Sequence, residues 1–266
     1  GEKGDEMVRK LADRLVGVDL LDRGAKLLDE QVEFRLKGVE KSRVGAQLAL
    51  IRIMASQPEE ALEALDESTG AALPEDLRTK RRHLRARALI ELGQTDAALQ
   101  LLDADESVDA DRLRGGIYWE AQDWPRAAQI LGRLIRAAGV KPQQDLNEKQ
   151  ALMVLNYAIA LTLGDNERGV TRVREDYGVP MEATPYRDAF KLITAPQTAG
   201  AINSRGVASK VQDAKNFQSF LAEYRERLKT HTLSELFMDS ASTGAPEEPA
   251  VSEAPETAEV TEKPIL

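Results

Sequence analysis

The chain has 266 residues, with 36 Lys and Arg against 45 Asp and Glu, so its formal net charge is −9, and 42% of its residues are hydrophobic. This balance is typical of a soluble globular chain. The acidic excess argues against general binding of nucleic acid, which needs a basic face. No run reaches the roughly 18 apolar residues of a membrane span, so the sequence predicts no membrane insertion. Cysteine is absent and there are only two histidines, which excludes disulfides, thiolate catalysis and metal sites built from Cys or several His.

Helical runs separated by short breaks make up most of the chain. Aromatic residues contribute only 5%, and no segment alternates apolar and polar residues as a half-buried strand does. Five times, a helical run ends in a break, and a small residue follows about five positions into the next run. These anchors are 36, 37, 29 and 42 residues apart, at Ala25, Ala61, Ala98, Ala127 and Gly169. The sequence therefore predicts an all-α fold.

Each run and its successor are predicted to form an antiparallel pair of helices. Two helices approach closely where one carries a small residue, and larger apolar residues fill the seam on either side. This bulk comes from Leu89, Tyr118 and Leu161 on first helices and from Leu102, Leu131 and Val173 on second helices. The breaks contain residues typical of helix starts, among them Pro58 and Asp123. Thr184-Pro185 marks the start of one further helix.

From about residue 5 to residue 178, these small-residue and turn positions resemble the tetratricopeptide repeat. The stretches 82–104 and 111–134 fit that family well. No repeat holds the family's full Trp, Leu-Gly, Tyr, Ala and Pro set, and the spacings scatter around its ~34 residues. The resemblance implies a right-handed solenoid of about five antiparallel helix pairs within residues 1–206. A related solenoid of helical hairpins is the alternative.

A loop and an amphipathic helix are predicted beyond the last pair. Residues 194–206 are rich in small residues and predict a loop, and residues 207–238 predict the helix. A solenoid needs its last apolar face covered, so the helix is expected to act as a cap. The alternative is a docking or coiled-coil helix for another chain. Its apolar stripe is Val207, Val211, Ala214, Phe217, Leu221, Tyr224 and Leu228.

Residues 239–266 form an acidic, Pro-rich tail without aromatic residues. They carry seven Asp and Glu against Lys263 alone, a net charge of −6. Such a segment cannot bury enough apolar surface to fold and is predicted to be disordered. Most of the acidity therefore belongs to the tail, and the folded body is close to neutral. One hypothesis is that the tail folds back into a basic groove and competes with a partner.

No catalytic constellation stands out in the sequence. It has no Gly-rich phosphate loop, no nucleophile elbow and no His-Glu-x-x-His pair. His83, within Arg81-Arg82-His83-Leu84-Arg85, is expected to be an exposed residue on a helix face and not a catalytic group. The sequence therefore predicts a protein that is not an enzyme and has no cofactor and no metal.

The resemblance also implies a binding surface, because the first helices of tetratricopeptide pairs line a concave groove. The register places on that face Arg43, Lys80, His83, Arg87, Arg112, Trp119 and Glu120. Several cations and an indole suit an extended acidic or carboxylate-ended peptide, through charge-assisted hydrogen bonds and stacking. The alternative is a basic helix that faces water and pairs with carboxylates such as Asp76 and Glu91.

The expected function is a non-catalytic scaffold for protein–protein interaction, with an acidic peptide or protein segment as partner. The alternative is a structural module that self-assembles through the helix at 207–238 or spaces other domains; the oligomeric state is not predicted. The stretch from Leu27 to Gly38, the repeats and the acidic end resemble the C-terminal portion of large bacterial cell-envelope repeat proteins. That resemblance implies a periplasmic or envelope location and an upstream export signal, although a chain without Cys fits the cytoplasm nearly as well.

Overall fold

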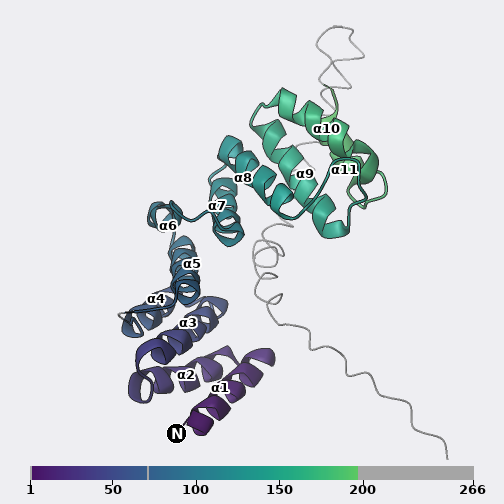
Figure 1. The fold of residues 1–266 in the computed structure, drawn as a ribbon. Coiled ribbons are helices and arrows are strands. Elements are labelled where there is room, and N and C mark those ends of the chain that lie inside the picture. Colours follow the sequence, from purple (N-terminus) through teal and green to yellow (C-terminus); the bar gives the residue numbers. More distant parts are fainter. Residues whose placement is uncertain (1, 71, 197–266) are drawn as a thin grey trace, which may run out of the picture.

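The computed structural model describes residues 2–70 and 72–196. Over this part of the chain it contains eleven α-helices and no strand, which confirms the all-α prediction. Consecutive helices pack on one another from α1 to α11, and the other principal contacts join α3 to α5, α5 to α7 and α9 to α11. Figure 1 shows the resulting path, with α1 at one end and α9, α10 and α11 at the other.

The helix bounds agree with the predicted runs and breaks. The helices are α1 (Glu2–Gly17), α2 (Leu21–Phe34), α3 (Gly38–Met54), α4 (Pro58–Glu67), α5 (Glu75–Glu91), α6 (Thr95–Leu102), α7 (Val108–Glu120), α8 (Trp124–Ala137), α9 (Glu148–Leu163), α10 (Glu167–Met181) and α11 (Arg187–Thr194). Pro58 is the first residue of α4, and the side chain of Asp123 accepts the Arg126 N–H at the start of α8. The further helix predicted at Thr184-Pro185 is α11, which starts two residues later at Arg187, after a turn.

Five short connections repeat one turn geometry, between α1 and α2, α3 and α4, α5 and α6, α7 and α8, and α9 and α10. In the fourth, the Gln122 N–H donates to Trp119 O at 3.0 Å and the Asp123 N–H donates to Tyr118 O at 2.8 Å. This is the Schellman pattern of a helix end, which places one residue at positive φ. The central residues at positive φ are Asp19, Ser56, Gly93, Gln122 and Asp165.

The turns also set where the paired helices approach each other. Seven residues before each central residue, the first helix carries a small residue: Ala12, Ala49, Ala86, Gly115 and Ala158. Five residues after it, the second helix carries Gly24, Ala61, Ala98, Ala127 and Val170. The predicted anchors Ala61, Ala98 and Ala127 therefore lie five residues after their central turn residues. Ala25 and Gly169 lie one residue away from that position. At Gly24 a Cβ atom would lie 3.2 Å from Ala12 O, so the close approach falls there and not at Ala25.

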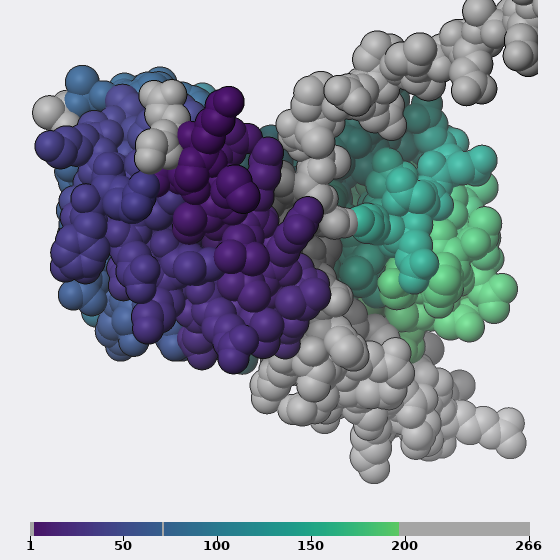
Figure 2. All heavy atoms as spheres, turned by 90° about the horizontal axis from the view of Figure 1, so that it is seen from below, coloured from purple at the N-terminus to yellow at the C-terminus, as the bar shows by residue number. Residues whose placement is uncertain are grey.

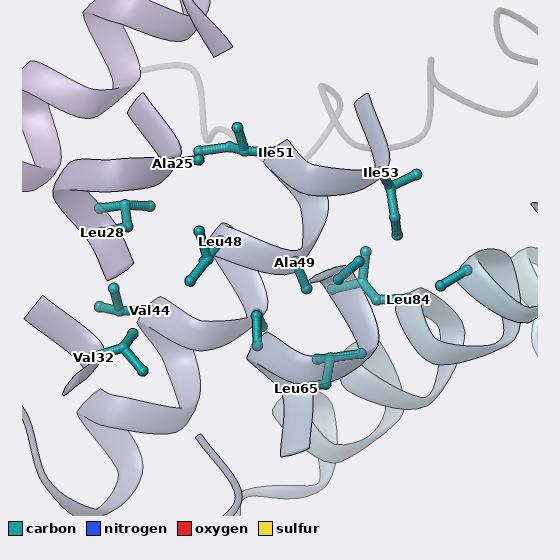
Figure 3. Close-up of a cluster of buried hydrophobic side chains, with 14 of the residues drawn as sticks. Ala25, Leu28, Val32, Val44, Leu48, Ala49, Ile51, Ile53, Leu65 and Leu84 are labelled. Atoms are coloured by element: carbon teal, nitrogen blue, oxygen red, sulfur yellow. The ribbon is translucent and has the colours of Figure 1, made fainter. Parts of the chain in front are cut away.

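Buried apolar side chains form three clusters in succession along the chain. The first joins α1 to α5, the second joins α5, α6 and α7, and the third extends from α7 to α11. Figure 3 shows part of the first cluster, where Leu28 and Val32 of α2, Leu48 of α3 and Leu65 of α4 lie between their helices. The predicted seam residues belong to these clusters: Leu89, Leu102, Tyr118, Leu131, Leu161 and Val173. Packing between chain neighbours is what a helical repeat-like fold requires.

Three sequence predictions lie outside the described residues. They are the remainder of the loop at 194–206, the capping helix at 207–238 and the disordered tail at 239–266. Thr194, where that loop was predicted to begin, is the last residue of α11.

Candidate binding surfaces

The basic run of α5 is only partly available to a partner. Arg81 is buried, and its guanidinium donates to Ser42 O at 2.6 Å, to Leu65 O at 2.5 Å and to Ser68 Oγ at 3.0 Å. Burial lowers the pKa of Arg81 because it disfavours the charged form. Arg85 forms an ion pair with Asp66. These contacts tie α5 to α3 and to the end of α4, so much of the run serves the fold.

The prediction that His83 is exposed is wrong, because its side chain is only 16% exposed. Its Nε2 lies 2.8 Å from Oδ2 of the buried Asp105, which also accepts a hydrogen bond from Arg82 Nη2 at 2.9 Å. Burial alone would raise the pKa of Asp105, but hydrogen bonds from Ser107 and His83 outweigh it and hold that pKa well below its ordinary value. The prediction of an exposed histidine failed because Asp105 approaches from the connection between α6 and α7.

A second buried carboxylate, Asp111 of α7, joins α7 to α8. Its Oδ1 accepts hydrogen bonds from Arg114 Nη2 at 2.6 Å and Arg133 Nη2 at 2.5 Å, and its Oδ2 accepts one from Arg133 Nε at 2.8 Å. Burial acts to raise the pKa of Asp111, and the two guanidinium groups lower it further than burial raises it. Sequence reasoning missed this network, since an acid in a helix of mixed charge gives no signal of burial.

The other predicted site residues lie on α3, α5 and α7. Arg43, Lys80 and Glu120 are exposed. Arg43 Nη1 lies 3.0 Å from Glu40 Oε1, and Arg112 Nη1 lies 2.8 Å from Asp109 Oδ1. Arg87 and Trp119 also have neighbours within their own helix pairs. Arg87 Nε is 3.8 Å from Glu91 Oε1. The Trp119 ring contacts the Trp124 ring edge-on, with the ring centroids 5.3 Å apart.

The repeated turns show which of these residues hold equivalent positions. Arg43 and Lys80 each lie thirteen residues before the central turn residue of their pair, and His83 and Arg112 each lie ten before theirs. Because α3 packs on α5 and α5 packs on α7, equivalent positions follow one another along these helices. We call Lys80, Arg87, Arg112 and Trp119 the basic face.

A groove of about 510 Å³ lies between α2, α3 and α4. Its floor includes the buried side chains of Val32, Leu48 and Ala64. Five carboxylates line it, and among the described residues none of them has an ion-pair partner: Asp29, Glu33, Glu60, Glu63 and Glu67. Its two basic residues are Lys41 and Arg52, and Arg52 Nη1 donates to Gln57 Oε1 at 2.7 Å. We call this feature the acid-lined groove.

The acids of this groove are regularly spaced in the sequence. Asp29 and Glu33 on α2, and Glu60, Glu63 and Glu67 on α4, recur at spacings of three and four, so each set shares one helix face. Only the packing of α2 and α4 on α3 shows that the two faces border the same groove.

The part of the chain that the structure describes contains no candidate metal site and no candidate membrane-spanning helix. It contains no group of three or more acidic or His side chains that could hold a metal ion, and none of its helices combines the length and apolarity of a membrane span. Comparisons with protein-family models, with curated proteins and with solved structures found no match to this chain.

Proposed function

We propose that this protein is a non-catalytic interaction scaffold whose helix pairs stack in a right-handed, tetratricopeptide-like solenoid. Four observations support the stack: the five equivalent turns, the small residues at fixed distances from them, the packing between chain neighbours and the three successive apolar clusters. Stacked units of this kind present a continuous surface that binds without a covalent step.

The basic face is the proposed surface for an extended acidic peptide, and the observation that carries it is the packing of α5 on α7, the two helices that bear its residues. Lys80 and Arg87, seven residues apart, share one face of α5, and Arg112 and Trp119 share one face of α7 in the same way. On this proposal the two faces line the groove of a tetratricopeptide-like stack. A carboxylate that reaches two neighbouring first helices would meet cations on both. Such charge-assisted hydrogen bonds are stronger than neutral ones.

The local partners of these cations do not block such binding. Arg112 is paired with Asp109 three residues away on the same exposed helix face, and ion pairs of this kind contribute only about 0–1 kcal/mol. Lys80 has no ion-pair partner among the described residues. An incoming carboxylate can therefore replace the intrahelical partner at little cost, which makes Lys80 and Arg112 the residues to test.

The test measures the anisotropy of a fluorescein-labelled peptide of about ten glutamates with a free C-terminal carboxylate. The variant K80E/R112E is compared with R23E/K26E, which reverses two exposed charges on α2 and so changes the net charge equally. We expect K80E/R112E to weaken binding about ten-fold, or ~1.4 kcal/mol, and the control to change it less than about two-fold. Equal losses in both variants would reduce the effect to net charge and would contradict the basic face.

The acid-lined groove supports a second candidate, the binding of a basic partner segment. The favouring observation is the set of five carboxylates, which have no ion-pair partner among the described residues, around a floor of buried aliphatic side chains. Arg and Lys side chains suit such a groove, because their aliphatic stems cover apolar surface while their charged ends reach the carboxylates. On this proposal the scaffold holds two oppositely charged segments on different helices.

The location and the wider assembly remain part of the proposal. The likeness of Leu27 to Gly38 and the following repeats to bacterial envelope proteins supports a periplasmic or envelope scaffold, with the cytoplasm as alternative. A self-assembling or spacing module built on residues 207–238 is the alternative function, and sedimentation of the wild type and of the variant F217D/L221D distinguishes the two.

A further inference from the structure

The last long helix, α10, is covered differently from the earlier second helices. α4, α6 and α8 each pack between two first helices, and those first helices have 13 to 17 residues. α10 has 15 residues and packs between α9 and α11, which has only 8. At 1.5 Å per residue, α11 is about 12 Å long against about 22 Å for α10. Part of α10 therefore has no helix beyond it in the described chain.

Two grooves lie where α10 and α11 border each other. The first, of about 320 Å³, has a mainly apolar lining that includes Gly178, Met181 and Phe190. The second, of about 330 Å³, is lined by residues of the α9–α10 turn together with Val170 and Ile193. Both grooves share Arg174 and the segment Thr194–Pro196. They meet at the point where the described chain ends.

We propose that residues 207–228 of this same chain occupy these two grooves. The segment begins about ten residues after Pro196, and its apolar residues recur at spacings of three and four. As a helix its 22 residues would be about 33 Å long, enough to cover the rest of α10. A tether of about ten residues also keeps the segment at an effective concentration near the millimolar range, which favours it over a separate partner.

The chemistry of the grooves agrees with that occupant. Met181 and Phe190 are buried at the base of the first groove, where Phe217, Leu221 and Tyr224 of the segment would add apolar contacts. Arg174, Arg187 and Lys191 border this groove, and Glu182 pairs with Lys191. The segment carries Asp213 at the edge of its apolar stripe, four residues before Phe217 and within reach of the basic rim. On this proposal, the helix that the sequence predicts to be a cap covers the surface formed by α10 and α11.

Hydrogen exchange of the full chain tests the inference. F217D/L221D places two aspartates in the apolar stripe, and the control Q212D/S219D places two on the opposite side of the same segment, with the same change of net charge. We expect amides of α10 and α11 to exchange about ten-fold faster in F217D/L221D than in the wild type, because their cover is lost. The control should leave them unchanged, and α3 to α5 should exchange alike in all three proteins.

Two results would overturn the proposal. Identical exchange of α10 and α11 in all three proteins would mean that residues 207–228 do not cover them. Protection that falls on dilution, together with sedimentation as a dimer that F217D/L221D dissociates, would instead assign the segment to a second copy of the chain. Sedimentation of the wild type as a monomer at every concentration, with protection lost only in F217D/L221D, supports docking within one chain.

Discussion

Gly45 of α3 lies so close to Ser68, the residue that follows α4, that a Cβ atom at position 45 would overlap the Ser68 side chain. Ser68 cannot easily move away, since its Oγ donates to Ala64 O at 2.6 Å and accepts from Arg81 Nη1 at 3.0 Å. The absence of a side chain at Gly45 thus lets α3, α4 and α5 meet around one buried polar junction.

Gly45→Ala is expected to destabilise the protein by about 1–3 kcal/mol, because the added methyl group must displace a hydrogen-bonded side chain. The free energy of unfolding in urea, followed by circular dichroism, measures the effect. Gly17→Ala is the control: no atom lies within 4 Å of its added Cβ and φ is not positive there, so it should be neutral or stabilise by up to about 1 kcal/mol. A Gly45→Ala protein as stable as the wild type would contradict the close approach.

The repeated turns give a second prediction: substitutions at two of their central residues, Gly93 and Gln122, should change stability in opposite directions. Gly93 has φ +72° and Gln122 has φ +57°, a region in which a residue with a side chain is disfavoured by about 1 kcal/mol. Gly93→Ala should therefore cost about 1 kcal/mol, since its Cβ would meet no other atom and only the backbone preference changes.

Gln122→Gly should stabilise the protein by about 0.5–1 kcal/mol, because glycine adopts this φ without strain. Thermal unfolding of the two variants measures both effects. Gln122→Ala removes the same side chain but keeps a Cβ, so it should not stabilise. A gain of stability in Gln122→Ala equal to that in Gln122→Gly would attribute the effect to the lost side chain and not to the backbone.

Features set by residues close in sequence could be predicted, and features set by distant packing could not. The helices, the breaks and the anchors Ala61, Ala98 and Ala127 follow from periodicity and from small residues near turns. The burial of Arg81 depends instead on carbonyl groups of Ser42 and Leu65, which belong to other helices. A one-dimensional pattern shows that a residue is charged, but it cannot show which charged residues another helix will cover.

The candidate surfaces show the same division. Lys80 and Arg112 could each be placed at a known distance from the turn of its helix pair, because those turns lie within the sequence. His83 was predicted to be exposed, and the buried Asp105 that contacts it lies 22 residues away. The acid-lined groove requires the relative placement of three helices, which no spacing along one helix specifies.

The buried carboxylate of Asp105 predicts how the free energy of unfolding changes at low pH. Its pKa in the folded protein lies below the ordinary value of 3.8, so its stabilising effect is complete above that value and is lost as the pH falls further. Asp105→Asn should cost about 1–3 kcal/mol at pH 7, the usual cost when a buried hydrogen-bonded charge loses its interactions. The unfolding free energies of wild type and variant should converge progressively as the pH falls below 3.8, because the carboxyl group of the unfolded chain then binds a proton before that of the folded protein does.

Denaturant unfolding at a series of pH values, followed by fluorescence of the two tryptophans, checks this convergence. Asp103→Asn is the control, because Asp103 is an exposed neighbour in the same connection. Its curve should run parallel to that of the wild type. If the difference between wild type and Asp105→Asn were the same at every pH, the effect would not come from the ionised carboxylate.

The last prediction concerns the acid-lined groove and a fluorescein-labelled peptide of about ten arginines and leucines. E33K/E63K reverses one charge on each wall of the groove, whereas E30K/E59K reverses two exposed charges on the same helices outside it. Both variants change the net charge equally. We expect E33K/E63K to weaken binding about ten-fold, or ~1.4 kcal/mol, and E30K/E59K to weaken it less than about two-fold.

Binding should also weaken as salt rises, since exposed charges are screened over about 10 Å at 0.1 M. K80E/R112E should bind this basic peptide as well as the wild type does or better, because its substitutions lie on α5 and α7 and not in the groove. Equal losses in E33K/E63K and E30K/E59K would show that the peptide responds to overall charge alone. In that case the five carboxylates of the groove would form a solvated face of α2 and α4 with no preference for a basic partner.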